Sequence, residues 1–201
     1  MAMAGLLLKL LPPSPPNDGA TTSTTSPAAV KLTYPEFNGW LWELPGGFRV
    51  LVDPILIGNL DFGIPWLFDA AKKTLPKSQP VAGLLAGVDL LLITQSLDDH
   101  CHLRTLTQLA AIRPGLPVVA TPNARPILSA LPFTHVTYLE PGQSTAAAAV
   151  TVLATASPVL GPPWQRPENG YIVTTAAGGK TEIERAEDAG GRGREGGRGG
   201  G

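Results

Sequence analysis

An unbroken apolar run constrains the fold of this chain more than any other feature. The run, GVDLLLIT at residues 87–94, leads directly into HLRTLTQLAAI, whose apolar residues recur at helical spacing. A strand without polar residues must be covered on both faces, as in a sheet that lies between two layers. LPVVAT and THVTYL repeat the strand pattern, and NARPILSAL between them is predicted to be a helix. The order β-α-β-α-β predicts an α/β layered fold.

Further strands are expected on either side of this unit. KLTYPEFNGWLWEL and FRVLVDPIL are rich in aromatic and β-branched residues, and Pro45-Gly46-Gly47 between them predicts an antiparallel hairpin. GIPWLFDAAKKTL, residues 63–75, is predicted to be a short helix with a proline near its start. AVTVLAT and GYIV are the last expected strands. Three tryptophans are expected to pack in the core or at a sheet edge: Trp40, Trp42 and Trp66.

The two ends of the chain differ in composition from the middle. Residues 1–30 are rich in hydroxyl groups and proline and poor in acids, which is typical of an organelle transit peptide. We therefore expect a chloroplast protein, with the cytoplasm as the alternative. Residues 174–201 are rich in Gly, Arg and Glu and are expected to form a disordered tail. A single domain at 31–173 remains between them.

Charge and cysteine content argue against several kinds of partner. The net charge is −1, so no basic field favours nucleic acid or anionic lipid. No apolar run is long enough to cross a bilayer. A lone cysteine, Cys101, excludes an intrachain disulfide and a cysteine-based zinc site. The sequence therefore predicts neither a nucleic-acid nor a membrane partner, and it identifies no other partner.

Ionisable residues gather in TQSLDDHCH, residues 94–102, directly after the long apolar strand. In α/β folds, chemistry concentrates where a strand ends and the chain turns into a helix. Asp98 or Asp99 is suited to cap that helix, since a carboxylate accepts backbone N–H bonds there. The same two acids are an alternative acid–base pair. Neither interpretation accounts for His100 and His102.

The block TQSLDDH resembles the T-H-x-H-x-D-H motif of the metallo-β-lactamase superfamily, which also stands between a buried strand and a helix. LTYPEFNGWLWE followed by VLVDPIL is similar to that superfamily's opening hairpin, whose second strand ends in an aspartate, here Asp53. GPPWQRPENGYIV resembles a loop and strand of its plant and cyanobacterial branch, related to the lactonase-like hydrolases. The resemblance covers 31–173 and implies an αββα sandwich with an incomplete second half.

The resemblance also shows which metal ligands are kept and which are replaced. It makes Asp99 and His100 the candidate metal ligands, with Asp99 the candidate catalytic residue and Asp53 a supporting residue. The first two histidines of the motif are replaced by Gln95 and Leu97. Leucine has no lone pair to offer, and a glutamine amide is a poor zinc ligand beside imidazole.

Other ligands of the family site are missing as well. A third family histidine would fall near Ser157, and the three histidines of the chain cannot supply a dinuclear site. The resemblance implies a hydrolase whose zinc activates water against an ester, lactone or phosphoester. Because most ligands are replaced, we expect no bound cofactor and no metal-dependent hydrolysis, with zinc as the metal if one binds.

Three further patterns are alternative sites. Ser96, His135 and Asp99 could make a catalytic triad, but no G-x-S-x-G turn supports it. TTAAGGKT at 174–181 resembles a phosphate loop that lacks its first glycine. Trp164 beside Arg166 could bind a carbohydrate or an anion, although a tryptophan that plugs the sheet edge is the favoured interpretation.

Three hypotheses for the function follow. The first is a hydrolase-like protein with a degenerate metal motif, either a relic or a binding protein. The second is a hydrolase with an atypical mononuclear site at Asp99, His100 and one further ligand. The third is a chain whose incomplete second half leaves sheet edges unpaired, so that it folds poorly alone.

Overall fold

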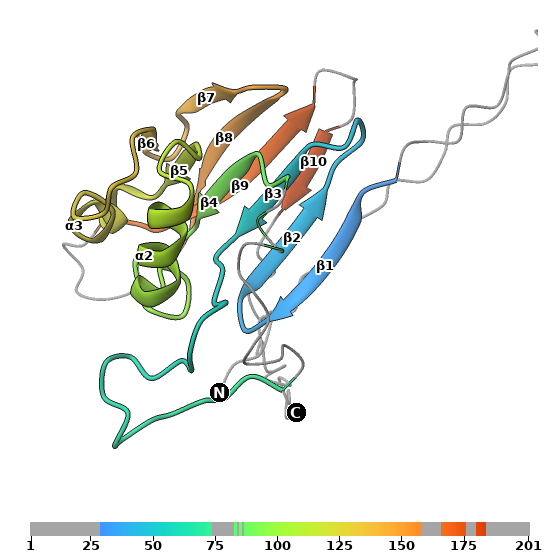
Figure 1. Cartoon of the computed structure of the whole chain (residues 1–201). Helices are drawn as coiled ribbons and strands as arrows, with labels where there is room; N and C mark the ends of the chain where they lie inside the picture. The colour runs from blue at the N-terminus through green and yellow to red at the C-terminus, as the bar shows by residue number, and fades with distance from the viewer. Residues whose placement is uncertain are drawn as a thin grey trace, which may run out of the picture.

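The computed structural model describes residues 29–73, 83, 85, 87–157, 166–175 and 180–183. The expected leader, except its last two residues, and most of the expected tail lie outside these ranges. Within the described part, the strands form one six-stranded and one four-stranded sheet (Figure 1). The α/β class expected from the sequence is therefore confirmed.

The six-stranded sheet has the order β1-β2-β3-β4-β5-β6. Its first three strands are antiparallel, and β3, β4, β5 and β6 run parallel to one another. The expected hairpin is present, because β2 and β3 flank the turn that contains Gly46 and Gly47. The strands of this sheet are β1 (Lys31–Glu36), β2 (Gly39–Glu43), β3 (Arg49–Val52), β4 (Leu90–Ile93), β5 (Val118–Ala120) and β6 (Val136–Tyr138).

The four-stranded sheet is antiparallel and has the order β10-β9-β8-β7. Its strand β9 passes the expected domain boundary at residue 173 and ends at Thr175, and its residues 171–174 pair with β10. The sequence had indicated β8 and β9 but not their two neighbours. The strands are β7 (Ser144–Ala147), β8 (Val150–Ala156), β9 (Asn169–Thr175) and β10 (Lys180–Ile183).

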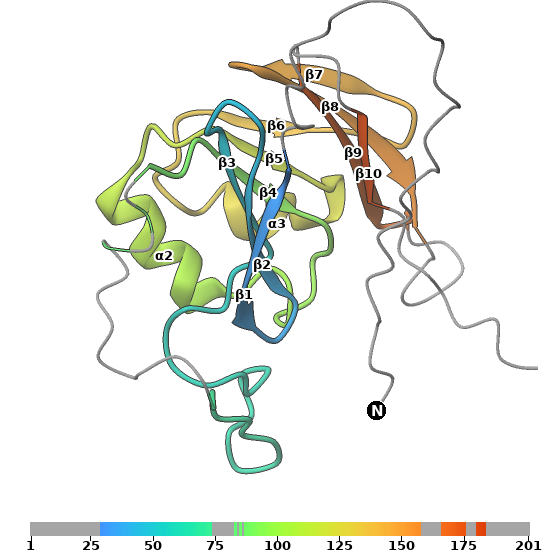
Figure 2. The ribbon, with the colours of Figure 1, turned by 90° about the vertical axis from the view of Figure 1, so that its right-hand side faces the viewer.

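The helical segments with defined bounds are α2 (Leu103–Ile112), the 3-10 helix η1 (Pro122–Ala124) and α3 (Arg125–Leu128). Figure 2 shows α2 on one face of the six-stranded sheet and the four-stranded sheet on the other. Leu128 of α3 belongs to the same core cluster as Leu106 of α2, so α3 packs on the α2 face. The layers are thus helix, sheet and sheet. This arrangement explains why the central strand is apolar throughout, since neither of its faces meets water.

The side chains of β4 alternate between two cores. Leu91 and Ile93 pack toward the helices, in a cluster that contains Leu106 of α2. Leu90 and Leu92 pack toward the second sheet, in a cluster that contains Val152 and Val173 among others. All four β4 side chains are fully buried. Each contributes about 1.5–3 kcal/mol of burial free energy, so β4 stabilises both interfaces of the sandwich.

Residues 63–73 are not helical, in contrast to the expectation for GIPWLFDAAKKTL. The segment is a loop closed by a bridge between Leu60 and Ala70, and its first part contains left-handed backbone at Phe62 and Gly63. Its large apolar side chains Ile64, Trp66 and Leu67 are exposed. Trp66 is 84% exposed, so the expectation that it packs in the core or at an edge is wrong, whereas Trp42 is buried.

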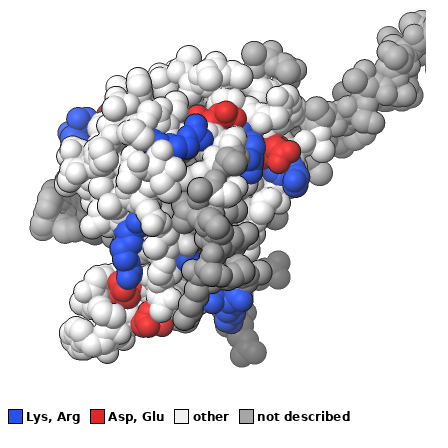
Figure 3. All heavy atoms as spheres, viewed as in Figure 1, with Lys and Arg blue, Asp and Glu red and all other residues white. Residues whose placement is uncertain are grey.

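Charged residues are scattered over the face shown in Figure 3 and do not gather in a single patch. In the part of the chain that the structure describes, no helix is long and apolar enough to span a bilayer.

The double burial of β4 leads to a stability prediction. Leu91→Ala should lower the free energy of unfolding by about 2–5 kcal/mol, because it leaves a cavity in a packed core. Leu103→Ala is the matched control, since Leu103 is 50% exposed. The control should cost less than about 1 kcal/mol. Urea denaturation measures both, and equal losses would contradict the described packing.

Candidate functional site

The candidate site lies where the parallel strands β3 and β4 end side by side. Asp53 directly follows β3, and Thr94 directly follows β4. The backbone amide of Asp53 donates to the carbonyl of Leu92 at 3.0 Å, which fixes the two strand ends together. Carboxyl ends of neighbouring parallel strands are where α/β folds place functional groups, and the sequence motif is found at this edge.

The carboxylate of Asp53 is the hub of this edge. It is buried and accepts hydrogen bonds from the backbone amide of Thr94 at 2.8 Å and from the Thr94 hydroxyl. It also contacts His100 Nδ1 at 2.7 Å. Because a carboxylate can only accept here, Nδ1 of His100 carries the proton. Asp53, to which the resemblance gives a supporting role, thus joins the end of β4 to His100.

The lone pair on the other ring nitrogen of His100 faces Asn38. The Asn38 amide nitrogen lies 3.0 Å from His100 Nε2, 3.1 Å from Asp99 Oδ2 and 3.1 Å from the Asp99 carbonyl oxygen. All three neighbours are acceptors. The NH2 end of the Asn38 side chain, and not its carbonyl oxygen, must therefore face them. Asn38 therefore donates to both groups that the family motif would offer to a metal.

Asn38 reaches this place through the tight turn between β1 and β2. The turn has left-handed backbone at Glu36 and Phe37, and Gly39 follows it. A Cβ at Gly39 would lie 3.4 Å from the carbonyl oxygen of Asp53 and 3.2 Å from that of Glu36. The glycine thus lets the turn approach the end of β3. Sequence reasoning missed Asn38 because nothing local marks a turn asparagine as part of a site 61 residues away.

The remaining motif positions differ in their contacts and in their burial. Asp99 Oδ2 lies 3.6 Å from His100 Nε2, and Asp99 Oδ1 is buried without a partner among the described residues. Gln95 is 2% exposed, whereas Leu97 is 44% exposed. The two positions that replace the family's first histidines therefore differ in burial, and Leu97 supplies no donor atom.

The expected helix cap is wrong. Helix α2 begins at Leu103, its N-cap residue is His102, and residues 98–100 form a turn before it, so neither Asp98 nor Asp99 caps the helix. The Thr105 hydroxyl accepts from the backbone amides of Leu56 and Ile57 at 2.9 and 3.2 Å. It therefore donates its own proton to His102 Nδ1 at 2.8 Å.

His102 and Cys101 are unsuited to metal binding in this arrangement. His102 is fully buried, with its Nδ1 bound to the Thr105 hydroxyl and the backbone of Asn59 within reach of the ring. Burial lowers the pKa of His102, and the positive charges of Arg104 and Lys72 act in the same direction, against an opposing effect of Asp98. Burial raises the pKa of Cys101 to about 12, so its thiol stays protonated and unreactive.

The second sheet contacts the site through Glu168, which precedes β9, and through Asn169, the first residue of β9. The Glu168 side chain is fully buried and accepts from the Ser96 hydroxyl at 2.7 Å, while its Oε2 has no partner among the described residues. The backbone amide of Asn169 donates to the Thr94 carbonyl at 3.0 Å. Sequence reasoning missed Glu168, although a polar pair directly before a buried strand is a usable signal.

Of the alternative sites, only the triad lies wholly within the described residues. Ser96 binds Glu168, and His135 is exposed with Nδ1 against the Thr134 hydroxyl, so the triad with Asp99 does not form. Residues 176–179 of the proposed phosphate loop lie outside the described residues. Thr181, at the end of the proposed phosphate loop, lies in β10. Trp164 lies outside the described residues.

The donor set does not fit a metal ion of the family type. Among the described residues, no group of three or more His, Cys, Asp or Glu side chains could hold one. A catalytic zinc ion needs about three protein ligands and one open position. Of the motif positions that carry ligands in the family, only those of Asp99 and His100 keep a side chain of the right chemistry, and both already accept from Asn38.

Comparisons with known proteins identify one sequence family and several structures of similar fold. Residues 31–181 match the sequence family described as "Beta-lactamase superfamily domain". No curated protein matches the sequence. A metallo hydrolase from the archaeon Ignicoccus hospitalis is 17% identical, with a TM-score of 0.52 over 80% of this chain and 63% of its own. A diiron β-hydroxylase from Streptomyces venezuelae is 22% identical, with a TM-score of 0.51 over 75% of this chain and 28% of its own.

These two likenesses concern the fold alone, because both identities are low. This chain spans less than two thirds of either structure. The additional parts of those proteins have no counterpart in the match, so their activities say nothing direct about this chain.

The position of Asn38 predicts a stability effect. Asn38→Ala should lower the free energy of unfolding by about 1–3 kcal/mol, because it leaves half-buried and buried acceptors without their donor. Asn59→Ala is the matched control, since the bond from Asn59 to Asp69 is exposed. The control should change the value by less than about 0.5 kcal/mol. Urea denaturation at neutral pH tests both, and an equal cost would contradict the role given to Asn38.

Burial of neutral His102 predicts a pH effect. The folded ring has a lowered pKa, so the unfolded chain binds more protons, and stability should fall as the pH drops through about 6.5. Urea midpoints between about pH 8 and pH 6 measure the slope. His102→Gln should flatten it, whereas His135→Gln, at an exposed residue, should not. An unchanged slope in His102→Gln would refute this assignment.

Proposed function

Since the β-lactamase superfamily domain matches residues 31–181, this chain belongs to that superfamily, and we propose that it is a member whose metal motif has degenerated and that does not carry out metal-dependent hydrolysis. The metallo-β-lactamase-like fold expected from the sequence is confirmed. The chain is hydrolase-like in architecture. The chemistry available to this fold depends on the residues at the ends of β3 and β4.

The observation that carries the proposal is the Asn38 amide. A metal ion would need the lone pair of His100 Nε2 and an oxygen of Asp99. The amide nitrogen lies 3.0 Å from the first and 3.1 Å from Asp99 Oδ2. The tautomer supports this assignment, since Asp53 holds the proton on Nδ1 and leaves Nε2 as an acceptor. The hydrogen-bond network is therefore complete around His100 with protein groups alone.

The replaced positions support the same proposal. Zinc hydrolases lower the pKa of a bound water through a cation held by about three nitrogen, sulfur or oxygen ligands. Leu97 supplies no donor atom, and the amide of Gln95 is a weak substitute for imidazole. Without a tightly held cation, nothing at this edge generates hydroxide at neutral pH. The residues present instead hold two strand ends and a turn in one arrangement.

One observation favours the alternative of an atypical mononuclear hydrolase. Asp99 Oδ1 is buried and has no partner among the described residues, so one carboxylate oxygen remains to bind a cation. That alternative also requires Asn38 to leave His100 and a third ligand to be recruited. It needs two rearrangements, whereas the degenerate site needs none, and this difference supports the first proposal.

The finer family placement and the location are proposals as well. The likeness of GPPWQRPENGYIV to the plant and cyanobacterial lactonase-like branch and the hydroxyl-rich, acid-poor residues 1–30 together support a chloroplast member of that branch. Residues 158–165 of that loop lie outside the described structure, so this support comes from the sequence.

Metal content tests the proposed function. After dialysis of the full chain against excess zinc and removal of loosely bound ions, elemental analysis should find far less than one zinc per chain. The variant with Gln95→His, Leu97→His and Asn38→Ala should retain more zinc, because it adds two imidazoles and removes the competing amide. If the wild type holds one zinc per chain and Asp99→Ala loses it, the mononuclear alternative is correct.

A further inference from the structure

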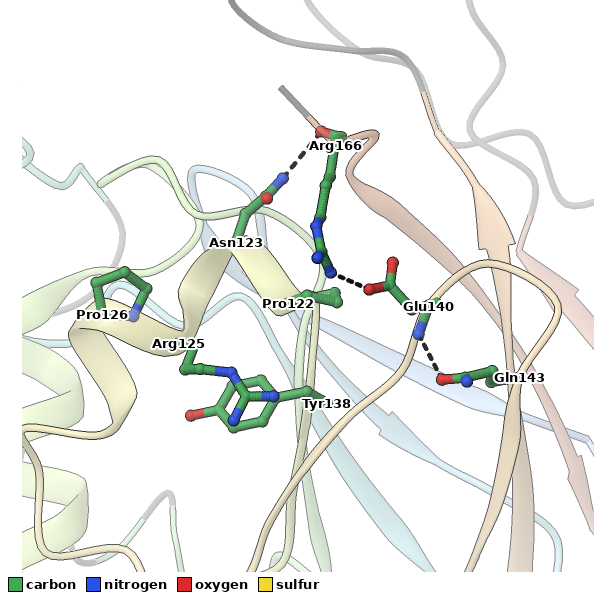
Figure 4. A pocket seen from close by; sticks show the side chains of 8 residues that line it. All are labelled: Pro122, Asn123, Arg125, Pro126, Tyr138, Glu140, Gln143 and Arg166. Carbon is green, nitrogen blue, oxygen red and sulfur yellow. Dashed lines mark hydrogen bonds and ion pairs between the residues drawn. The ribbon is translucent and has the colours of Figure 1, made fainter. Parts of the chain in front are cut away.

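A pocket of about 610 Å³ opens at the carboxyl ends of β5 and β6. It lies on the same edge of the six-stranded sheet as the Asp53 hub, but beyond β4. Its walls come from η1 and the start of α3, from the end of β6 and the turn after it, and from Arg166 before β9 (Figure 4). No motif-based interpretation of the sequence included this place as a whole.

Hydrogen bonds between the walls hold the pocket in shape. The side-chain amide of Asn123 donates to the backbone carbonyl of Arg166 at 3.0 Å, which ties η1 to the segment before β9. The backbone amide of Glu140 donates to the Gln143 side chain at 2.9 Å, which fixes the turn after β6. A pocket whose walls are already tied loses little conformational freedom when a ligand binds.

The two arginines of the pocket have different partners. Arg166 forms an ion pair with Glu140, so their charges cancel. The guanidinium of Arg125 instead lies 4.1 Å from the centre of the Tyr138 ring (Figure 4). No hydrogen bond or ion pair of the Arg125 side chain to another described residue is present. The stacking fixes the plane of the guanidinium, and its N–H donors remain available.

We propose that this pocket binds a small organic anion through Arg125. The planar guanidinium offers paired donors that match a carboxylate or a phosphate group. One positive charge is left uncompensated after Arg166 and Glu140 are paired, which favours a ligand with an anionic group. Pro122, Pro126 and the Tyr138 ring supply an apolar wall for the body of the ligand.

The proposal is independent of the proposed loss of hydrolysis. None of the interactions that shape the pocket involves Asp53, Asn38 or His100, and none requires a metal ion. The pocket can therefore bind its ligand whether or not zinc binds at the other end of this edge.

Two anionic probes and one neutral probe test the site on the full chain. Benzoate and phenyl phosphate should bind with dissociation constants on the order of 1 mM, whereas neutral benzamide should not bind detectably at about ten times that concentration. Amide NMR spectra of labelled protein should show the shifts gathered at residues 122–126 and 138–143. The tighter of the two anions identifies whether a carboxylate or a phosphate is preferred.

Variants distinguish binding at Arg125 from a nonspecific effect of the protein's positive charges. Arg125→Gln should weaken binding of the anions about tenfold, and Arg125→Lys, which keeps the charge but loses the fork, should weaken it less. Glu140→Gln should strengthen binding, because it releases Arg166. Lys31→Gln is the control, since it removes one positive charge at an exposed ion pair on β1.

The spectra of each variant outside the pocket should match the wild type, which confirms that it folds. Absence of binding for both anions, shifts that gather elsewhere, or equal affinities in wild type and Arg125→Gln would overturn the proposal.

Discussion

The rest of the structure at this edge depends on the buried carboxylate of Asp53. It accepts hydrogen bonds from the backbone and side chain of Thr94 and from His100, and so joins the ends of β3 and β4 to the turn that follows β4. Its backbone adopts left-handed geometry, which aspartate tolerates better than most residues. The carboxylate also determines which nitrogen of His100 is protonated, and thereby which atom faces Asn38.

Two layers of interactions surround this hub and give it a fixed environment. On the helix side, Thr105 anchors the segment after β3 through Leu56 and Ile57. On the other side, Asn169 and Glu168 connect the second sheet to Thr94 and Ser96. The same edge extends past β5 and β6 to the arginine-lined pocket. Two chemically different places thus lie along one row of strand ends.

Much of the fold could be predicted from the sequence, because its signals are local. The apolar run at 87–94 indicated a strand covered on both faces, and Gly46 and Gly47 indicated the hairpin turn. The helix predicted at 63–75 is absent from 63–73. Its proline and apolar residues suit a helix, but Ile64, Trp66 and Leu67 stay exposed. The residues of the candidate site also fall into a predictable and an unpredictable group. Asp53, Asp99 and His100 stand in a motif, whereas Asn38, Thr105 and Glu168 act through contacts that only the folded chain creates.

The turn that carries Asn38 makes the present arrangement hard to reverse. Histidines at positions 95 and 97 would supply donor atoms, yet the Asn38 amide would still occupy the lone pair of His100. Asn38 belongs to a different strand pair and is encoded far from the motif, so single changes in the motif cannot remove it. Under the proposed function, recovery of a metal site therefore requires a change in the turn between β1 and β2 as well as changes in the motif.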